Sequence, residues 1–98
     1  MAISGDGDAL QALLLGRYRR LLLAIARDLP ADVAQRTSAE DVLQDTFLAA
    51  FRGIAKFEEA GEGSFDRWLY SIAGNSVRDA IKRHRAAKRD GRRAILPA

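Results

Sequence analysis

The sequence predicts an all-α fold, a compact bundle of three main helices to which a short fourth can be added. Residues 8–28, 37–57 and 64–90 each place apolar side chains at steps of three and four. That spacing puts the side chains on one face of a helix, which then needs a core to pack against. No stretch alternates apolar and polar residues as a half-buried strand does. These observations favour helices packed on helices.

The length of 98 residues predicts one domain. The apolar share of 48% is ordinary for a globular chain and supports a single modest core. We expect the helical domain to cover residues 9–90, after a flexible leader at residues 1–8. Residues 91–98 are expected to begin a linker to a C-terminal domain that is absent from this sequence.

The first main helix is expected from Asp8 to about Asp28, and Pro30 ends it because proline cannot continue the helical hydrogen-bond ladder. Gly16 in its interior costs about 1 kcal/mol relative to alanine, unless a neighbouring helix crosses closely there. Residues 31–37 form a short connection in which Ala31–Ala34 can make a helical turn. The predicted buried stripe of the first helix comprises Leu10, Leu13, Leu14, Tyr18, Leu21, Leu22, Ile25 and Leu29.

The second main helix is predicted to open at a capping box from Thr37 to Glu40 and to run to about Phe57. In such a box the hydroxyl accepts from a free helix amide, and the glutamate reaches back to the cap residue. The predicted buried stripe comprises Leu43, Phe47, Ala50, Phe51 and Ile54. The opposite side comprises Asp41, Gln44, Asp45, Leu48 and Arg52.

The third main helix, from Ser64 to Asp90, follows an acidic loop at residues 58–63 whose glycines permit turns. Ser64 is expected to cap its start and Gly91 to stop it. Its apolar face comprises Phe65, Trp68, Leu69, Ile72, Ala73, Ser76, Val77, Ala80 and Ile81. The opposite face comprises Arg67, Tyr70, Ser71, Asn75, Arg78, Asp79, Lys82 and Arg85.

The formal net charge is only +3, but the charges are unevenly placed. Half of the 16 lysines and arginines lie within residues 78–93, whereas within residues 38–66 seven acidic residues outnumber two basic ones. Two different partners explain such polarity better than one partner does.

Composition argues against several functional classes. Without cysteine there is no disulfide framework, thiolate zinc site or thiol nucleophile. The single histidine, His84, lies in the basic run KRHR without a carboxylate at helical spacing, so we expect no enzyme activity, no metal site and no cofactor. The longest apolar run, Leu21 to Ala26, is far too short to span a bilayer, and the N-terminus lacks a signal pattern. We therefore expect a cytoplasmic protein that does not insert into membranes.

One candidate binding surface is the exposed wall of the second helix. Asp41 and Asp45 are four residues apart with Gln44 beside them. A solvated helix face is one interpretation of these residues. The other is a patch that grips basic side chains of a partner helix, with Leu48 adding apolar contact.

The second candidate surface is the polar face of the third helix. Tyr70 offers a ring for stacking on an unpaired base, and Asn75 an amide that pairs best with an adenine edge. The basic run that follows can hold phosphates. Trp68 falls on the apolar stripe and is assigned to the core. Two other interpretations stay open: a generic basic helical module that binds duplex DNA, and a protein-binding helical domain whose basic end serves solubility.

Together these residues resemble conserved region two of bacterial sigma factors, most of all the extracytoplasmic-function (ECF) group of the sigma-70 family. That group has a D-x-x-Q-[DE]-x-F helix, a loop, and then an S-F-x-x-W-L-Y-x-I-A-x-N segment running into a basic helix. The first motif appears here as Asp41, Gln44, Asp45 and Phe47. The second appears as Ser64, Phe65, Trp68, Leu69, Tyr70, Ile72, Ala73 and Asn75. The likeness covers roughly residues 10–89.

The resemblance implies a transcription initiation domain with three partners. The helix of the first motif would dock on the clamp coiled coil of the large RNA polymerase subunit, through Asp41, Gln44, Asp45 and Leu48. The loop and the helix after it would capture non-template-strand bases of the melted minus-ten promoter element and hold its phosphates. The residues implied on this DNA side are Ser64, Arg67, Tyr70, Ser71, Asn75, Arg78, Lys82 and Arg85. An anti-sigma factor is the third implied partner.

The sequence departs from the family pattern in two ways. No helix-turn-helix domain follows within the sequence, although the family normally has one after a linker. The base-capture loop is also unusually acidic, with Glu58, Glu59 and Glu62, and like charge near a phosphate backbone is unfavourable.

Overall fold

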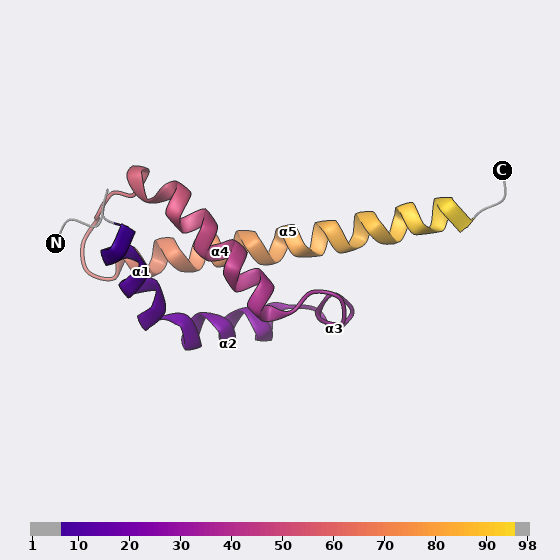
Figure 1. Cartoon of the computed structure of the whole chain (residues 1–98), viewed down its shortest axis with the longest axis horizontal. Coiled ribbons are helices and arrows are strands. Elements are labelled where there is room, and N and C mark those ends of the chain that lie inside the picture. Colours follow the sequence, from indigo (N-terminus) through magenta and orange to yellow (C-terminus); the bar gives the residue numbers. More distant parts are fainter. Residues whose placement is uncertain (1–6, 96–98) are drawn as a thin grey trace.

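The computed structural model describes residues 7–95, and it describes side chains as far as residue 89. Helices occupy nearly all of this range, and no strand occurs within it, which confirms the predicted all-α fold (Figure 1). The elements are α1 (Gly7–Gly16), α2 (Tyr18–Asp28), α3 (Ala31–Ala34), α4 (Ala39–Gly53), the single 3₁₀ turn η1 (Ile54–Lys56) and α5 (Ser64–Ile95). No helix of the described part is long and apolar enough to cross a membrane.

Helix α5 is the axis of the molecule (Figure 1). Its first half packs against α4, which crosses it, and α2 packs against both. The second half of α5 extends past the bundle, which explains an elongated shape of 59 × 23 × 22 Å. The short α3 also touches α5. The arrangement leaves one side of α4 and the outer side of α5 uncovered by other helices.

The core confirms most of the predicted apolar stripes. Its buried apolar residues are Leu10, Leu14, Leu21, Ile25, Leu29, Val33, Val42, Leu43, Ala50, Ile54, Phe65, Leu69, Ala73, Val77 and Ala80. The predicted burial of Tyr18 and Phe51 is wrong, because both are exposed, and Thr46 is buried instead. Since α4 packs on α2 and α5 together, its buried face centres on Thr46. The Thr46 hydroxyl donates to the Val42 carbonyl at 2.8 Å, which satisfies it inside the core.

The predicted single helix over residues 8–28 is wrong, because the helix breaks at Arg17. The Arg17 backbone, at φ −109° and ψ 2°, leaves the helical path, and its amide donates to the Leu14 carbonyl at 3.0 Å. Gly16 directly before it is a weak helix former. The break turns α2 away from α1 and aims the Arg17 side chain at the start of α5.

Three predicted helix ends also differ. The N-cap of α4 is Ser38 rather than Thr37, and the Ser38 hydroxyl accepts from the Asp41 amide at 3.1 Å. At the start of α5 the Gly63 carbonyl accepts the first helical bond, from the Arg67 amide, so Gly63 takes the cap position predicted for Ser64. Helix α5 continues through Gly91, since a glycine weakens a helix but ends it only where the backbone turns left-handed.

These ends shift the expected domain limits. Of the expected leader, residues 7 and 8 belong to α1. Of the expected linker, residues 91–95 belong to α5. Residues 1–6 and 96–98 lie outside the described range.

Candidate functional site

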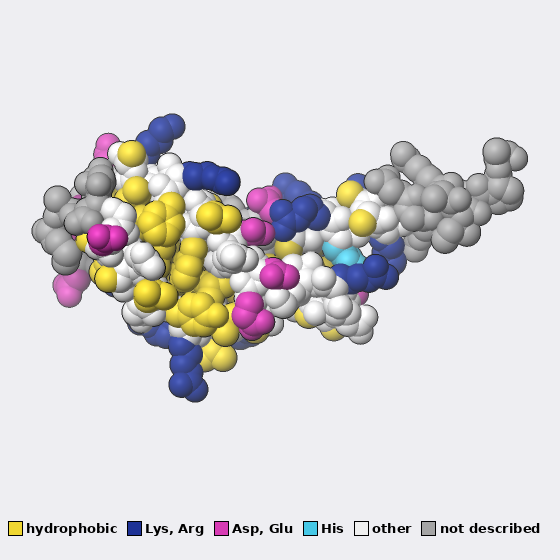
Figure 2. Space-filling model, in the orientation of Figure 1, with side chains coloured by type: hydrophobic (Ala, Val, Ile, Leu, Met, Phe, Trp, Pro, Cys, Tyr) yellow, Lys and Arg dark blue, Asp and Glu magenta, His cyan; other side chains and the backbone are white. Residues whose placement is uncertain are grey.

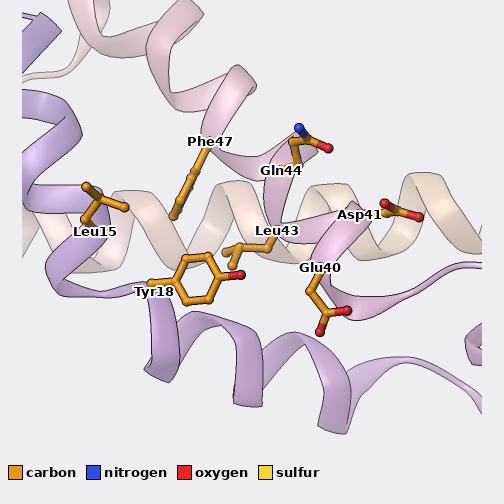
Figure 3. Close-up of a pocket in the computed structure, with 7 residues that line it drawn as sticks. All are labelled: Leu15, Tyr18, Glu40, Asp41, Leu43, Gln44 and Phe47. Carbon is orange, nitrogen blue, oxygen red and sulfur yellow. The ribbon is translucent and has the colours of Figure 1, made fainter.

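A groove of about 410 Å³ runs between the α1–α2 junction and α4. Figure 3 shows Tyr18 and Phe47 pointing toward each other across it, and their ring centroids are 6.3 Å apart in an edge-on arrangement. Glu40 and Asp41 stand at one end of the groove. The lining residues are Leu15, Tyr18, Glu40, Asp41, Leu43, Gln44 and Phe47. An apolar groove with carboxylates at one end suits an amphipathic partner helix that carries basic side chains.

This face of the molecule is the most apolar part of the visible surface (Figure 2). Hydrophobic side chains gather there over α1, α2 and α4, and acidic side chains lie beside them near the start of α4. Leu15, Tyr18 and Phe51 are among the large hydrophobic residues that remain exposed. Apolar patches rimmed by polar groups are typical of protein interaction sites.

The four residues predicted to bind polymerase are all exposed on α4, but only two of them line the groove. Asp41 and Gln44 line the groove, and Leu48 is exposed further along the helix. Asp45 instead faces α5, where its Oδ2 lies 3.3 Å from Nη2 of Arg83. Asp41 and Gln44 thus lie beside an apolar groove, whereas Asp45 already has a partner within the domain.

The acidic loop at residues 58–63 is held at its base by an aromatic cluster of Phe57, Phe65 and Trp68. The ring centroids of Phe57 and Trp68 are 5.0 Å apart, those of Phe65 and Trp68 5.6 Å, and those of Phe57 and Phe65 5.8 Å. Because Phe57 precedes the loop and the other two follow it, the cluster fixes both ends. Trp68 is partly buried and packs on the core, as predicted.

Two glycines shape the loop itself. Gly61 and Gly63 have φ values of 93° and 80°, in the left-handed region that favours glycine. The Ser64 amide donates to the Gly61 carbonyl at 3.2 Å, and Arg67 Nη1 donates to the Glu62 carbonyl at 3.2 Å. The loop is thus a defined turn with a cationic side chain laid against its backbone.

Helix α5 presents most of the residues predicted to bind DNA. Seven are exposed along it: Arg67, Tyr70, Ser71, Asn75, Arg78, Lys82 and Arg85. The eighth, Ser64, is only 8% exposed, so the geometry does not support its predicted contact with DNA. Ser64 is the first residue of α5 and is buried like Phe65 after it.

Two of the exposed polar side chains on α5 already have partners within the helix. Arg78 Nη2 donates to Asn75 Oδ1, and the Ser71 hydroxyl donates to the Trp68 carbonyl at 2.7 Å. A bidentate amide contact with adenine uses both the oxygen and the nitrogen of Asn. The Asn75 oxygen keeps one lone pair for a base while Arg78 occupies the other, so the Arg78 contact orients the amide and leaves it able to read a base.

Sequence reasoning missed three long-range contacts that surround these surfaces. Arg17 pairs with Asp66, 49 residues further along the chain. Arg83 pairs with Asp45. His84 is mostly buried, with Nε2 3.2 Å from the Asp32 carboxylate of α3. Local spacing in the sequence cannot predict such pairs, because helical periodicity relates only residues on one helix.

A metal site finds no support in the part of the chain that the structure describes, where no three His, Cys, Asp or Glu side chains group together. The geometry defines a helical domain with two separate candidate surfaces, an apolar groove with acidic residues on α4 and a basic face on α5.

Comparison with known proteins identifies this class more closely. The sigma-70 region 2 family matches residues 14–87, so the chain belongs to that family. The RNA polymerase sigma-H factor of Pseudomonas aeruginosa is 35% identical over 77 residues, which are 79% of this chain and 37% of that protein. The ECF RNA polymerase sigma-E factor of Haemophilus influenzae is 33% identical over 77 residues, with the same coverage of 79% and 37%.

The RNA polymerase sigma factor CarQ of Myxococcus xanthus is 35% identical over 81 residues, which are 83% of this chain and 43% of that protein. These names support the resemblance to the ECF group. The chain spans less than half the length of these relatives. No solved structure matches it.

Proposed function

We propose that this domain acts in transcription initiation by binding two partners through two surfaces. The groove face of α4 docks on the clamp helices of RNA polymerase, and the loop at residues 58–63 with the outer face of α5 captures bases of the melted minus-ten promoter strand. An anti-sigma factor that covers the groove face would block the first of these steps. A domain with these partners works in the bacterial cytoplasm.

The observation that carries the proposal is the separation of the two surfaces on one rigid bundle. Asp41 and Gln44 line the groove on α4, whereas Tyr70 and Asn75 are exposed on α5. Helices α4 and α5 share a continuous core, including Leu43 on the first and Leu69 on the second. A partner can therefore bind on each side of the bundle at the same time.

The groove side of the proposal is tested by titrating the chain against the isolated clamp-helix segment of RNA polymerase. Gln44→Ala and Asp45→Arg should each weaken binding, and a central contact contributes about 2 kcal/mol, or roughly thirtyfold in affinity. Gln35→Ala and Asp28→Arg, at exposed residues that do not line the groove, are the matched controls. A folded wild-type chain that ignores the clamp segment would remove polymerase docking from the proposal.

The DNA side is tested with single-stranded DNA and core RNA polymerase. The oligonucleotide is selected from a random 12-nucleotide pool by the wild-type chain bound to the polymerase. Tyr70→Ala should weaken binding of that oligonucleotide by roughly 1–3 kcal/mol, the range for one stacked base, without changing affinity for the clamp segment. Stronger binding to duplex than to the single strand would favour the alternative of a generic basic duplex-binding module.

A further inference from the structure

We propose that Arg17 is a positioning residue for base capture: it holds the first turn of α5, and with it the loop at residues 58–63, in the geometry that receives DNA. The inference rests on the proposed function of that loop. It concerns a residue at the α1–α2 break, outside both motifs of the family resemblance.

The Arg17 side chain makes three contacts, two of them with the first turn of α5. Its Nε donates to Asp66 Oδ1 on the first turn of α5. Its Nη1 donates to the Leu13 carbonyl at 3.1 Å, and its guanidinium carbon lies 5.0 Å from the ring centroid of Phe65. A planar guanidinium can meet a carboxylate, a carbonyl and an aromatic face together, which the point charge of a lysine cannot do.

The Arg17 site is more enclosed than a surface ion pair. The Arg17 side chain is 21% exposed and that of Asp66 39% exposed. Charge-assisted hydrogen bonds in such surroundings are stronger than those in open solvent. Asp66 also lies in the first turn of α5, where a carboxylate complements the helix dipole. The pair therefore fixes both the position and the charge of the helix start.

The connection from Arg17 to the loop is a continuous set of packed groups. Phe65, beneath the guanidinium, touches Phe57 and Trp68, whose rings fix the two ends of the loop. A loop held in its bound shape before binding loses less entropy when a ligand arrives. Without Arg17, Phe65 loses its cation and Asp66 its partner, so the loop ends become free to shift.

The acidic character of the loop gives this support a second purpose. Glu58, Glu59 and Glu62 repel a phosphate backbone, so the loop must present its backbone and turn geometry rather than its carboxylates. Arg67 lies against the Glu62 carbonyl on one side, and Arg17 holds the helix start behind it. A loop with this charge can capture a base only in a restricted orientation. The Arg17 contacts that set this orientation therefore affect DNA binding.

The test compares Arg17→Met and Arg17→Lys with Arg19→Met, a matched change at an exposed residue of α2. For each folded variant, two affinities are measured: for the clamp-helix segment, and for the oligonucleotide selected by the wild-type chain bound to core RNA polymerase. Trp68, the chain's single tryptophan, reports the state of the aromatic cluster by its fluorescence. Arg17→Lys retains the charge and so keeps the test open if Arg17→Met does not fold.

We expect both Arg17 variants to bind the oligonucleotide about tenfold more weakly, because a hydrogen bond to a charged group contributes roughly what a tenfold change requires. The Trp68 emission should shift, and clamp affinity should stay at the wild-type value. Oligonucleotide affinity equal to that of Arg19→Met, or an equal loss of both affinities, would overturn the positioning role. If the wild-type chain enriches no sequence at all, the proposed function fails, and the positioning role fails with it.

Discussion

The ion pair between Arg83 and Asp45 should weaken polymerase docking by a measurable amount. It joins α5 to the proposed docking face across 3.3 Å. A clamp helix that binds Asp45 through a basic side chain has to displace Arg83 first. Removing that internal competitor by Arg83→Gln should therefore tighten binding of the clamp-helix segment.

The size of this effect follows from the exposure of the two side chains, 63% for Arg83 and 48% for Asp45. Exposed ion pairs contribute about 0.2–1 kcal/mol, so the gain in affinity should be about 1.4-fold to fivefold. At 1 M salt, where charges are screened beyond about 3 Å, the gain should shrink toward nothing.

The assay is fluorescence anisotropy of a labelled clamp-helix segment, titrated with wild type, Arg83→Gln and Lys88→Gln. Lys88 is exposed on the same helix, so its variant corrects for the loss of one positive charge. The effect of Arg83→Gln should disappear in an Asp45→Asn background, as a double-mutant cycle requires of a direct pair. The competition argument is refuted if Arg83→Gln and Lys88→Gln behave alike, or if the gain persists in that background.

Three further predictions concern stability and are read from urea unfolding followed by circular dichroism. Leu69→Ala removes a core side chain of 0% exposure and should cost about 2–5 kcal/mol, whereas Leu23→Ala at 62% exposure should stay within about 0.5 kcal/mol. Gly63→Ala, at φ 80° and with its Cβ 3.2 Å from Arg67 Nη1, should destabilise by at least about 1–2 kcal/mol. Gly74→Ala, inside α5 with ordinary contacts around its Cβ, should stabilise by up to about 1 kcal/mol; opposite signs at either glycine would contradict this account of the backbone.

Most of the fold follows from helical periodicity, because burial needs an apolar face and the spacing of Leu10, Leu43 and Leu69 with their neighbours supplies one on each helix. The errors came where periodicity cannot decide. Phe51 fits the stripe of α4 but lies outside the face that α2 and α5 cover, and Tyr18, at the start of α2, lines the open groove instead of the core. Which side of an amphipathic helix is covered depends on how many neighbours it has, and that is a property of the assembled bundle.

The helix ends were missed for local reasons. Ser38 and Thr37 are adjacent hydroxyl residues that can both cap a helix, and the extended backbone of Ser38 selects it. Gly16 alone gave a weak signal of a break. Arg17 also pairs with Asp66, 49 residues further along the chain, and no local pattern reveals that contact.

The sequence predicted which residues of the candidate surfaces are exposed, but not which residues from other helices surround them. Asp41, Gln44 and Tyr70 were expected to be exposed, and they are. Their surroundings were not predictable, because the groove depends on Leu15 of α1, a residue without any motif. The internal partner of Asp45 lies 38 residues away on another helix.

The pair between Asp45 and Arg83 also affects how the two proposed surfaces work together. If polymerase takes Asp45 from Arg83, the Arg83 cation loses its partner on α4, next along α5 to Lys82, which belongs to the face proposed to hold phosphates. Thermodynamic linkage then requires reciprocity: the factor by which polymerase strengthens DNA binding equals the factor by which DNA strengthens polymerase binding. With an exposed pair as the link, that factor has the same upper limit of about five. A larger measured coupling must therefore arise elsewhere, and the Arg17 contacts at the other end of α5 are where the structure offers a second support for the DNA face.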